Sequence, residues 1–283
     1  MKFKNMISLY LLALTLVSCG GSDDGPEPTT AIDPGNDPNF TIVANTDVGL
    51  NSFNRKVVVF GIDIYAVSTV EDEKLLHAAN VMAQYLDNDE DGNVDDPNVL
   101  SAMQSARAFM VMWKSENDLE RLDPPDGREG QDLGNDETRP EWHRNKTGEF
   151  DASLEEVWHI ISHAGYANAY PDVFGEGAGT TLSNAMDLAR GGRHSDIPNP
   201  YPAEAWYTYN DQTCDYECQT TEYFYWAITS QLGAQANRLG EIGHEWRLNT
   251  SQKLQEGDPA IYQLLTNPAY SLPTILPDGT YKQ

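Results

Sequence analysis

The sequence predicts an α+β fold in which a small N-terminal sheet precedes a mainly helical half. Strand-like segments, rich in β-branched and aromatic residues, come first in the chain. Helical patterns follow them instead of alternating with them, which favours α+β over a repeated βαβ arrangement. The 283 residues, 40% of them hydrophobic, are enough for one substantial core.

The individual elements follow from local patterns. Strands are predicted at 56–60, 62–67 and 106–113. Residues 68–71 have a capping-box pattern, which opens a helix that ends near Leu86. Residues 117–149 are polar and rich in Gly, Pro and acids, so they are predicted as a long irregular loop. Further helices are predicted at 152–164, 178–190, 219–239 and 256–265.

Acidic residues dominate the charge of the chain. There are 18 Lys and Arg against 44 Asp and Glu, a formal net charge of −26. Such a chain repels phosphate backbones, which excludes nucleic acid as a partner and favours a protein that handles cations.

The N-terminus has the features of an exported lipoprotein. A basic start and a short apolar stretch lead into Leu16-Val17-Ser18-Cys19, which resembles the bacterial lipobox. The resemblance implies a lipoprotein signal peptide over residues 1–18 and a lipid anchor at Cys19. The membrane is then a partner through this anchor alone.

The residues after the anchor predict a tether and one domain. Residues 19–39 are expected to form a lipidated, flexible acidic linker, and residues 40–283 a single α+β extracytoplasmic domain. Asp23 and Asp24 resemble the export tag of surface lipoproteins in the Bacteroidota. The expected location is therefore the outer membrane, with the domain periplasmic or exposed at the cell surface.

Two cysteines remain after the anchor. Cys214 and Cys218 would lie in an oxidising compartment, and i, i+4 spacing on a helix brings the Cα atoms within disulfide range. A disulfide is therefore favoured over a metal site for this pair.

An acidic loop follows the first predicted helix and has the spacing of a calcium site. From Asp87 to Asp95 the carboxylates alternate around a glycine that permits a sharp turn, which resembles EF-hand and dockerin-type calcium loops. Position 12 holds Asn98 instead of a bidentate glutamate, so either the calcium affinity is modest or Asp96 substitutes. The expected ligands of this structural calcium are Asp87, Asp89, Asp91, Asn93 and Asp95.

The predicted helix at 152–164 carries the main candidates for a second metal site. Glu155, Glu156, His159 and His163 fall within an arc of about 100° on an ideal helix. The two histidines, spaced i, i+4, present imidazoles from successive turns. One helix donates two zinc ligands with this spacing.

Glu222 lies on a later predicted helix, in the segment Thr221-Glu-Tyr-Phe-Tyr-Trp226. Two histidines at i, i+4 followed by a helical glutamate resemble the gluzincin metallopeptidases, and Glu222-Tyr-Phe resembles the third-ligand segment of lethal-factor-like members. The resemblance implies a zincin-like helical half that binds zinc through His159, His163 and Glu222. It also implies hydrolysis of a peptide or other small-molecule substrate.

The chain departs from that family at one position. Ile160 follows the first histidine, where the family has its general-base glutamate. Glu156 is expected to act as the catalytic base instead, and Glu155 to accept an imidazole N–H from outside the ligand set. The whole chain also resembles a family of secreted bacterial lipoproteins that pair such an acidic loop with such a histidine helix.

Two alternatives remain open from the sequence. The first is a non-catalytic, calcium-binding surface lipoprotein whose histidine helix is structural or vestigial. The second is a di-iron carboxylate protein built on Glu156/His159 and Glu241/His244, two Glu-x-x-His pairs. Glu241 and Glu245 are alternatives to Glu222 as the third ligand, whereas His77 and His143 are expected to be surface or hydrogen-bonded histidines.

Overall fold

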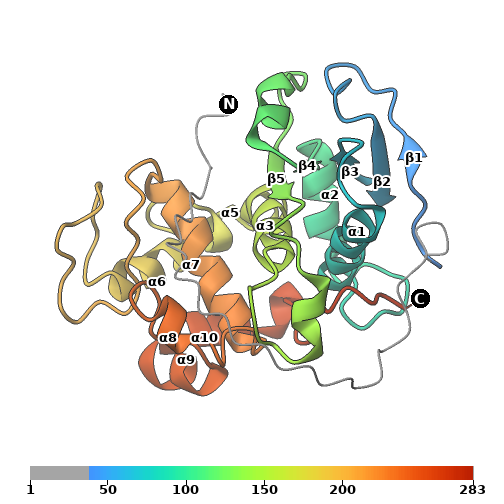
Figure 1. Ribbon diagram of the computed structural model, residues 1–283. Coiled ribbons are helices and arrows are strands. Elements are labelled where there is room, and N and C mark those ends of the chain that lie inside the picture. The colour runs from blue at the N-terminus through green and yellow to red at the C-terminus, as the bar shows by residue number, and fades with distance from the viewer. Residues whose placement is uncertain (1–37, 283) are drawn as a thin grey trace, which may run out of the picture.

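The structure is a computed structural model that describes residues 38–282. A five-stranded mixed sheet with strand order β1-β2-β3-β4-β5 comes first, and a mainly helical region follows it, so the predicted α+β class is confirmed (Figure 1). The pairs β1–β2 and β2–β3 are antiparallel, and β3–β4 and β4–β5 are parallel. The strands are Val43–Ala44 (β1), Arg55–Val59 (β2), Ile62–Ala66 (β3), Phe109–Trp113 (β4) and Gly130–Gly134 (β5).

Ten α-helices and a π-helix lie within the described residues. The helices of the first half are Asp72–Leu86 (α1) and Pro97–Ser105 (α2). The later helices are Ser153–Ile160 (α3), the π-helix Ile161–Tyr166, Ala167–Ala169 (α4), Pro171–Phe174 (α5), Thr181–Ala189 (α6), Tyr216–Gln231 (α7), Leu239–Ile242 (α8), Ser251–Gly257 (α9) and Pro259–Leu265 (α10). The predicted signal peptide, Cys19 and nearly all of the predicted linker lie outside the described residues.

The chain makes a tight hairpin turn between β2 and β3. Phe60 and Gly61 have φ angles of 46° and 83°, and Val59 pairs directly with Ile62. Two consecutive residues with positive φ give a turn whose twist matches that of the flanking strands.

The capping box predicted at residues 68–71 is wrong. The helix α1 begins at Asp72, and its N-cap residue Glu71 makes no side-chain capping bond. The preceding residues form a turn closed by the bond from Val70 N to Val67 O, and the Glu71 N–H is donated to Asn135 Oδ1 at 2.8 Å. Tertiary hydrogen bonds thus replace the local cap.

The long loop predicted at 117–149 is also wrong in part, because it contains the edge strand β5. This segment, Gly-Gln-Asp-Leu-Gly, contains a single apolar residue, Leu133, and therefore lacks the pattern of a strand. Glycine is required at Gly130, where an added Cβ would lie 2.6 Å from the ring of Phe109 on β4. Close packing against β4 therefore stabilises a strand that could not be predicted from its residue types.

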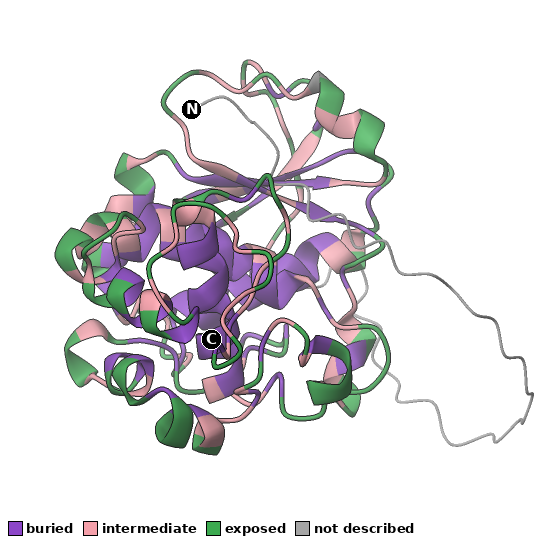
Figure 2. Ribbon diagram, turned by 90° about the vertical axis from the view of Figure 1, so that its left-hand side faces the viewer, coloured by how far each residue is buried: buried purple, intermediate pink, exposed green. Residues whose placement is uncertain are grey.

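The described residues form one hydrophobic core that includes both the sheet and the helices. The helix α3 lies at its centre, contacting β5, α1 and α7, and Figure 2 shows buried residues along the central helices beneath the sheet. Trp158 on α3 is fully buried and packs edge-on against Phe224 of α7, with ring centroids 5.1 Å apart. None of the helices in the described residues is long and apolar enough to cross a membrane.

The C-terminal segment 274–282 returns to α1 and to the acidic loop that follows it. Asn88 Oδ1 accepts two backbone N–H groups of this segment, both at 2.8 Å. Gln84 Oε1 accepts two more, at 2.9 and 2.8 Å, and the Tyr281 hydroxyl donates to Asp87. The end of the chain is therefore hydrogen-bonded to the loop predicted to bind calcium.

Candidate metal centre

Three potential ligand atoms meet between α3 and α7. Glu155 and His159 lie one turn apart on α3, and Glu222 projects from α7; one ligand atom from each lies within 4.8 Å of the other two. His159 is 2% exposed and Glu222 is 4% exposed. The separation between His159 Nε2 and Glu222 Oε2 is 3.6 Å. These buried groups could hold a metal ion.

The nitrogen that faces this group has no hydrogen-bond partner. His159 Nε2 is buried and unpaired, whereas Nδ1 of the same ring lies 3.3 Å from Glu156 Oε2. A carboxylate at Nδ1 favours the tautomer with its proton there, which leaves a lone pair on Nε2. A buried nitrogen lone pair without a donor is unusual unless it binds a ligand.

Burial and mutual repulsion raise the pKa values of several carboxyl groups in this region. Burial, and then the charge of Glu156, raises the pKa of Glu155 to about 7. Burial and the charges of Glu155 and Glu156 raise the pKa of Glu222 well above its usual value, and burial and Glu155 raise that of Glu245 to about 8. A divalent cation would offset this concentration of negative charge.

Glu156 lies beside the group and is partly accessible. Its side chain is 14% exposed, and its Oε2 accepts a hydrogen bond from Gln131 Nε2 on β5. Burial, followed by the charges of Asp132 and Glu137, raises the pKa of Glu156 well above its usual value. The raised pKa makes the ionised form of this carboxyl a stronger base than an ordinary glutamate.

The structure does not bring His163 into this group. The helix widens after His159 into the π-helix Ile161–Tyr166, which removes the regular i, i+4 relation assumed for the two histidines. His163 Nδ1 lies 2.8 Å from Glu176 Oε2, and its Nε2 lies 3.3 Å from Glu129 Oε2. The hydrogen bond to Glu176 raises the pKa of His163 to about 9, so this imidazole is held as a cation and not as a neutral ligand.

The π-helix lies against α2. An added Cβ at Gly165 would lie 2.7 Å from Val99 Cγ1 and 3.1 Å from Met103 Cγ. Glycine therefore permits the close approach of α2 at the point where the helix widens. Helix α2 begins at Pro97, and the carboxylate of its N-cap residue Asp96 accepts hydrogen bonds from the N–H groups of Asn98 and Val99 in the first turn.

The acidic loop brings together part of its expected ligand set. Carboxylate oxygens of Asp87, Asp89 and Asp95 lie within 4.8 Å of one another. Asp91 is not part of this group; its Oδ1 accepts the backbone and side-chain N–H groups of Asn93, at 2.8 and 3.0 Å.

Neither Asn98, at position 12 of the loop, nor Asp96, its expected substitute, belongs to the group formed by Asp87, Asp89 and Asp95. Besides capping α2, Asp96 accepts a hydrogen bond from the Tyr170 hydroxyl at 2.7 Å, so both of its oxygens are engaged. Asn98 Nδ2 lies 3.4 Å from the same hydroxyl. These contacts leave Asp96 poorly suited to replace the missing glutamate.

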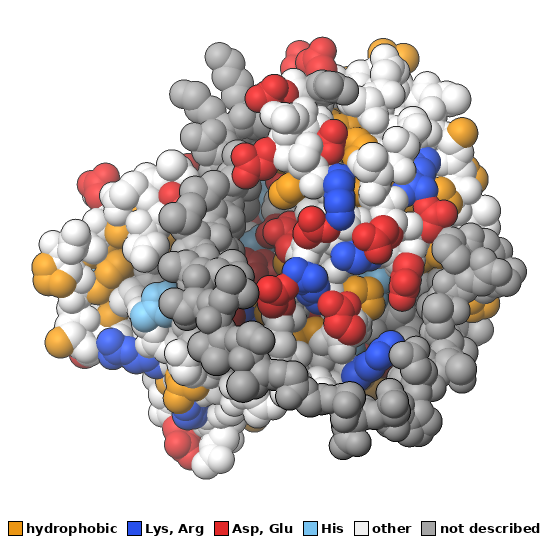
Figure 3. All heavy atoms as spheres, in the orientation of Figure 1, with side chains coloured by type: hydrophobic (Ala, Val, Ile, Leu, Met, Phe, Trp, Pro, Cys, Tyr) orange, Lys and Arg blue, Asp and Glu red, His pale blue; other side chains and the backbone are white. Residues whose placement is uncertain are grey.

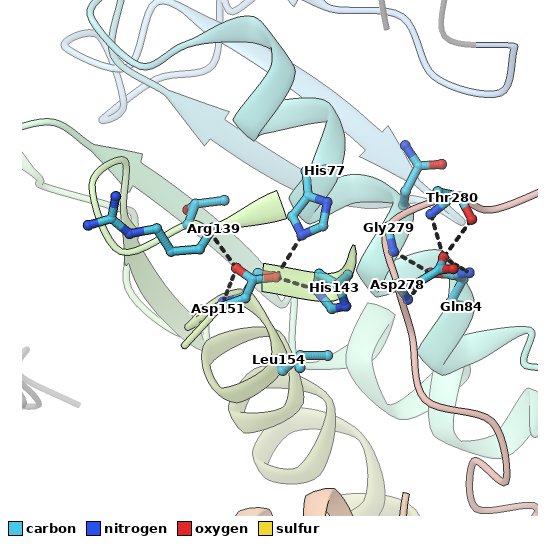
Figure 4. Close-up of polar contacts among 12 residues, drawn as sticks. His77, Gln84, Arg139, His143, Asp151, Leu154, Asp278, Gly279 and Thr280 are labelled. Atoms are coloured by element: carbon cyan, nitrogen blue, oxygen red, sulfur yellow. Dashed lines mark hydrogen bonds and ion pairs between the residues drawn. The ribbon is translucent and has the colours of Figure 1, made fainter. Parts of the chain in front are cut away.

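A third group, which was not identified from the sequence, joins α1 to the segment before α3 (Figure 4). His77 Nε2 and His143 Nε2 both lie 2.7 Å from Asp151 Oδ2, and the Ser153 hydroxyl donates to the same oxygen at 2.6 Å. The ligand atoms around one zinc ion would be about 3.4 Å apart, since zinc lies about 2.1 Å from each. The shorter contacts here are those of hydrogen bonds.

This group is expected to stabilise the fold. Burial alone would raise the pKa of Asp151, but the two imidazoles hold this pKa well below its usual value. Asp151→Asn should lower the free energy of unfolding by about 3–5 kcal/mol, the usual cost of breaking a buried charged network. Urea unfolding measures this, with Glu149→Asn, at an exposed acid nearby, as the control.

The pH dependence of stability follows from the same carboxylate. The pKa of Asp151 is lower in the folded protein than in the unfolded chain. The stability that its carboxylate contributes is therefore complete above the unfolded pKa of about 3.9 and is lost as the pH falls through the folded pKa. The wild type should therefore lose more stability than Asp151→Asn in this acidic range. Parallel curves for the two proteins would contradict this role of Asp151.

The remaining candidates occupy other places. Glu241 forms an ion pair with Arg238 on the surface, and His244 is exposed, so the second Glu-x-x-His pair lies apart from the group on α3. Cys214 and Cys218 form a disulfide with a Cα–Cα distance of 5.3 Å. In the orientation of Figure 3, acidic side chains and a histidine are visible in a hollow over α3, between the sheet and α7.

Comparisons of this chain with protein-family models, with curated proteins and with solved structures found no match. The geometry and chemistry of the site therefore have to support any functional conclusion.

Proposed function

We propose that the protein is a zinc-dependent, peptidase-like hydrolase that acts outside the cytoplasm as a tethered lipoprotein. The unpaired His159 Nε2, buried 3.6 Å from a Glu222 carboxylate oxygen, is the observation that carries the proposal. That separation is close to the roughly 3.4 Å expected between two ligands of one tetrahedral zinc ion. Glu155 supplies the third ligand atom.

The arrangement supports a metallopeptidase pattern in a different register from the one the histidines suggest. Glu155, Glu156 and His159 occupy the first, second and fifth positions of an H-E-x-x-H pattern in which glutamate replaces the first histidine. In this register Glu156 directly follows the first ligand, where the pattern has its general base. The isoleucine at position 160 is then no departure from the pattern.

The residues of the chain divide the reaction between them. A zinc ion bound here would polarise the substrate carbonyl and lower the pKa of a water toward about 7. Glu156 accepts the proton of the attacking water as the new C–O bond forms. Glu156 then gives that proton to the departing amine nitrogen as the C–N bond breaks. The side-chain amide of Gln131 holds the carboxylate of Glu156 from β5.

The composition of the site favours a divalent metal. Two carboxylates balance the charge of Zn²⁺, and a neutral imidazole is a preferred zinc ligand. Purified protein should contain one zinc per chain at this site and hydrolyse members of a peptide and ester panel, with activity lost to a chelator and restored by zinc. Absence of both zinc and hydrolysis would favour a non-catalytic, calcium-binding lipoprotein.

We also propose that the acidic loop binds calcium as a structural ion. The carboxylates of Asp87, Asp89 and Asp95 converge there, and calcium prefers such oxygen ligands. A dissociation constant of about 0.1–1 mM, typical of extracellular sites, gives about 1.4–2.7 kcal/mol of stabilisation at about 10 mM calcium. The melting temperature of the wild type should then rise by about 3–10 °C.

Asp89→Asn should remove that calcium-dependent rise. Asp89 is exposed, so its replacement should leave stability in chelator nearly unchanged. Asp196→Asn, at another exposed loop aspartate, is the control and should respond to calcium like the wild type. Equal melting temperatures of the wild type in calcium and in chelator would contradict calcium binding.

A further inference from the structure

A small pocket lies next to the candidate metal centre. Its volume is about 250 Å³, smaller than the pockets that hold whole drug-sized ligands and sufficient for one side chain. It is lined by two tyrosines, Tyr201 and Tyr209, by Glu245, and by a proline-containing segment at residues 197–200.

The pocket is fixed to the helix that carries Glu222. Tyr209 hydrogen-bonds Glu222 through its side chain, so one residue borders both the pocket and the metal centre. The segments bearing Tyr209 and Glu245 are joined by the antiparallel bridge between Tyr207 and Trp246. The Tyr207 hydroxyl donates to Gln219 O at 2.9 Å, and Trp246 Nε1 donates to Ser230 Oγ at 2.9 Å, which attaches this bridge to α7.

The pocket is lined by an acidic side chain that has no basic partner there. Its lining includes Glu245 and no lysine or arginine. The neighbouring cation Arg238 pairs with Glu241 instead, and no ion pair to Glu245 exists within residues 38–282. A carboxyl group and two tyrosine rings in one pocket lining suit a positively charged nitrogen. A bound cation would favour the ionised form of the carboxyl, and the rings would attract the cation and pack against its alkyl stem.

We propose that this pocket is the specificity subsite of the metal centre and binds a cationic nitrogen group of the substrate, with Glu245 as its counter-ion. The proposal rests on the proposed hydrolase function and specifies its substrate class. The cation could be a lysine or arginine side chain or the free N-terminal ammonium group, which share the same chemistry.

Matched peptides separate the two sources. Zinc-loaded wild type is assayed on peptides with arginine or its neutral isostere citrulline, and on peptides with a free or acetylated N-terminus. We expect kcat/KM to fall by about tenfold or more when the recognised charge is removed, mainly through KM. Glu245→Gln should lose this preference while keeping its zinc, and Glu241→Gln, which removes a paired surface charge nearby, should retain it.

A binding measurement keeps this proposal separate from the proposed function. Calorimetry with butylguanidinium should show binding to wild type at least about tenfold tighter than to Glu245→Gln, with neutral butylurea binding weakly to both. Binding without hydrolysis of any peptide would support the pocket and contradict the hydrolase. Hydrolysis without any charge preference would overturn the pocket alone, and loss of zinc from Glu245→Gln would identify Glu245 as a ligand and overturn it as well.

Discussion

His159→Ala is expected to lower zinc affinity by more than about 100-fold, whereas His163→Gln should keep one zinc per chain. His159 presents its unpaired Nε2 to Glu155 and Glu222, so its loss removes a ligand atom. Loss of residues that only support ligands typically costs about 10–100-fold, and loss of a ligand should exceed this. His163 is held by Glu176 and Glu129, away from the group. Elemental analysis and competition with a chromophoric chelator measure the difference.

A second ligand variant guards against a general loss of structure. Glu222→Gln leaves the side-chain volume nearly unchanged. This variant should also lose zinc, and its circular dichroism spectrum should match that of the wild type. If His163→Gln loses zinc as fully as His159→Ala, the two histidines act as a pair, and the register Glu155-Glu156-x-x-His159 is wrong.

Glu156→Gln is expected to lower kcat by about 10²–10⁴-fold while zinc remains bound. General acid–base catalysis contributes about this much, and an amide cannot accept the proton of a water. The glutamine oxygen can still accept the His159 Nδ1–H, so the orientation of the ligand ring is preserved. Measuring kcat and zinc content on the same preparation distinguishes lost chemistry from lost metal.

Glu155→Gln is the matched control, since it makes the same change at the adjacent residue. Because the Glu155 carboxylate lies within the ligand group, this variant should lose zinc affinity, and its activity should return in part at high zinc concentrations. This differs from the supporting role that the sequence suggested for Glu155. Identical behaviour of the two variants would contradict separate roles for base and ligand.

The sequence identified the helix of the candidate metal centre more reliably than the pairing of its residues. Glu155, Glu156, His159 and Glu222 were all recognisable as chemistry-bearing positions. Helical periodicity, however, gave His159 and His163 the same weight as Glu155 and His159, because both pairs are spaced i, i+4. The π-helix after Ile160 places His163 apart from His159 and leaves Glu155 and His159 as the pair. The sequence Ile-Ser-His-Ala-Gly-Tyr contains no pattern that predicts a π-helix.

The fold was predictable where strands were apolar and concealed where they were not. The hairpin β2–β3 and the strand β4 carry dense β-branched and aromatic residues, whereas β5 depends on close packing of Gly130 against Phe109. Asp96-Pro97 is a cap and first-turn signal that could have revealed α2. The group around Asp151 brings together residues as far apart as His77 and Ser153, and a single sequence contains no signal for such contacts.

The contact between the C-terminal segment and the acidic loop can form only late in synthesis, after the C-terminal segment has been translated. Gln84 and Asp278 lie 194 positions apart, so the partner of Gln84 is translated long after α1 is complete. Until then Asn88 Oδ1 and Gln84 Oε1 lack the backbone N–H groups that they accept in the folded protein, and the N-terminal half cannot reach its final stability alone. A premature stop codon that removes even the last few residues should therefore yield a protease-sensitive protein.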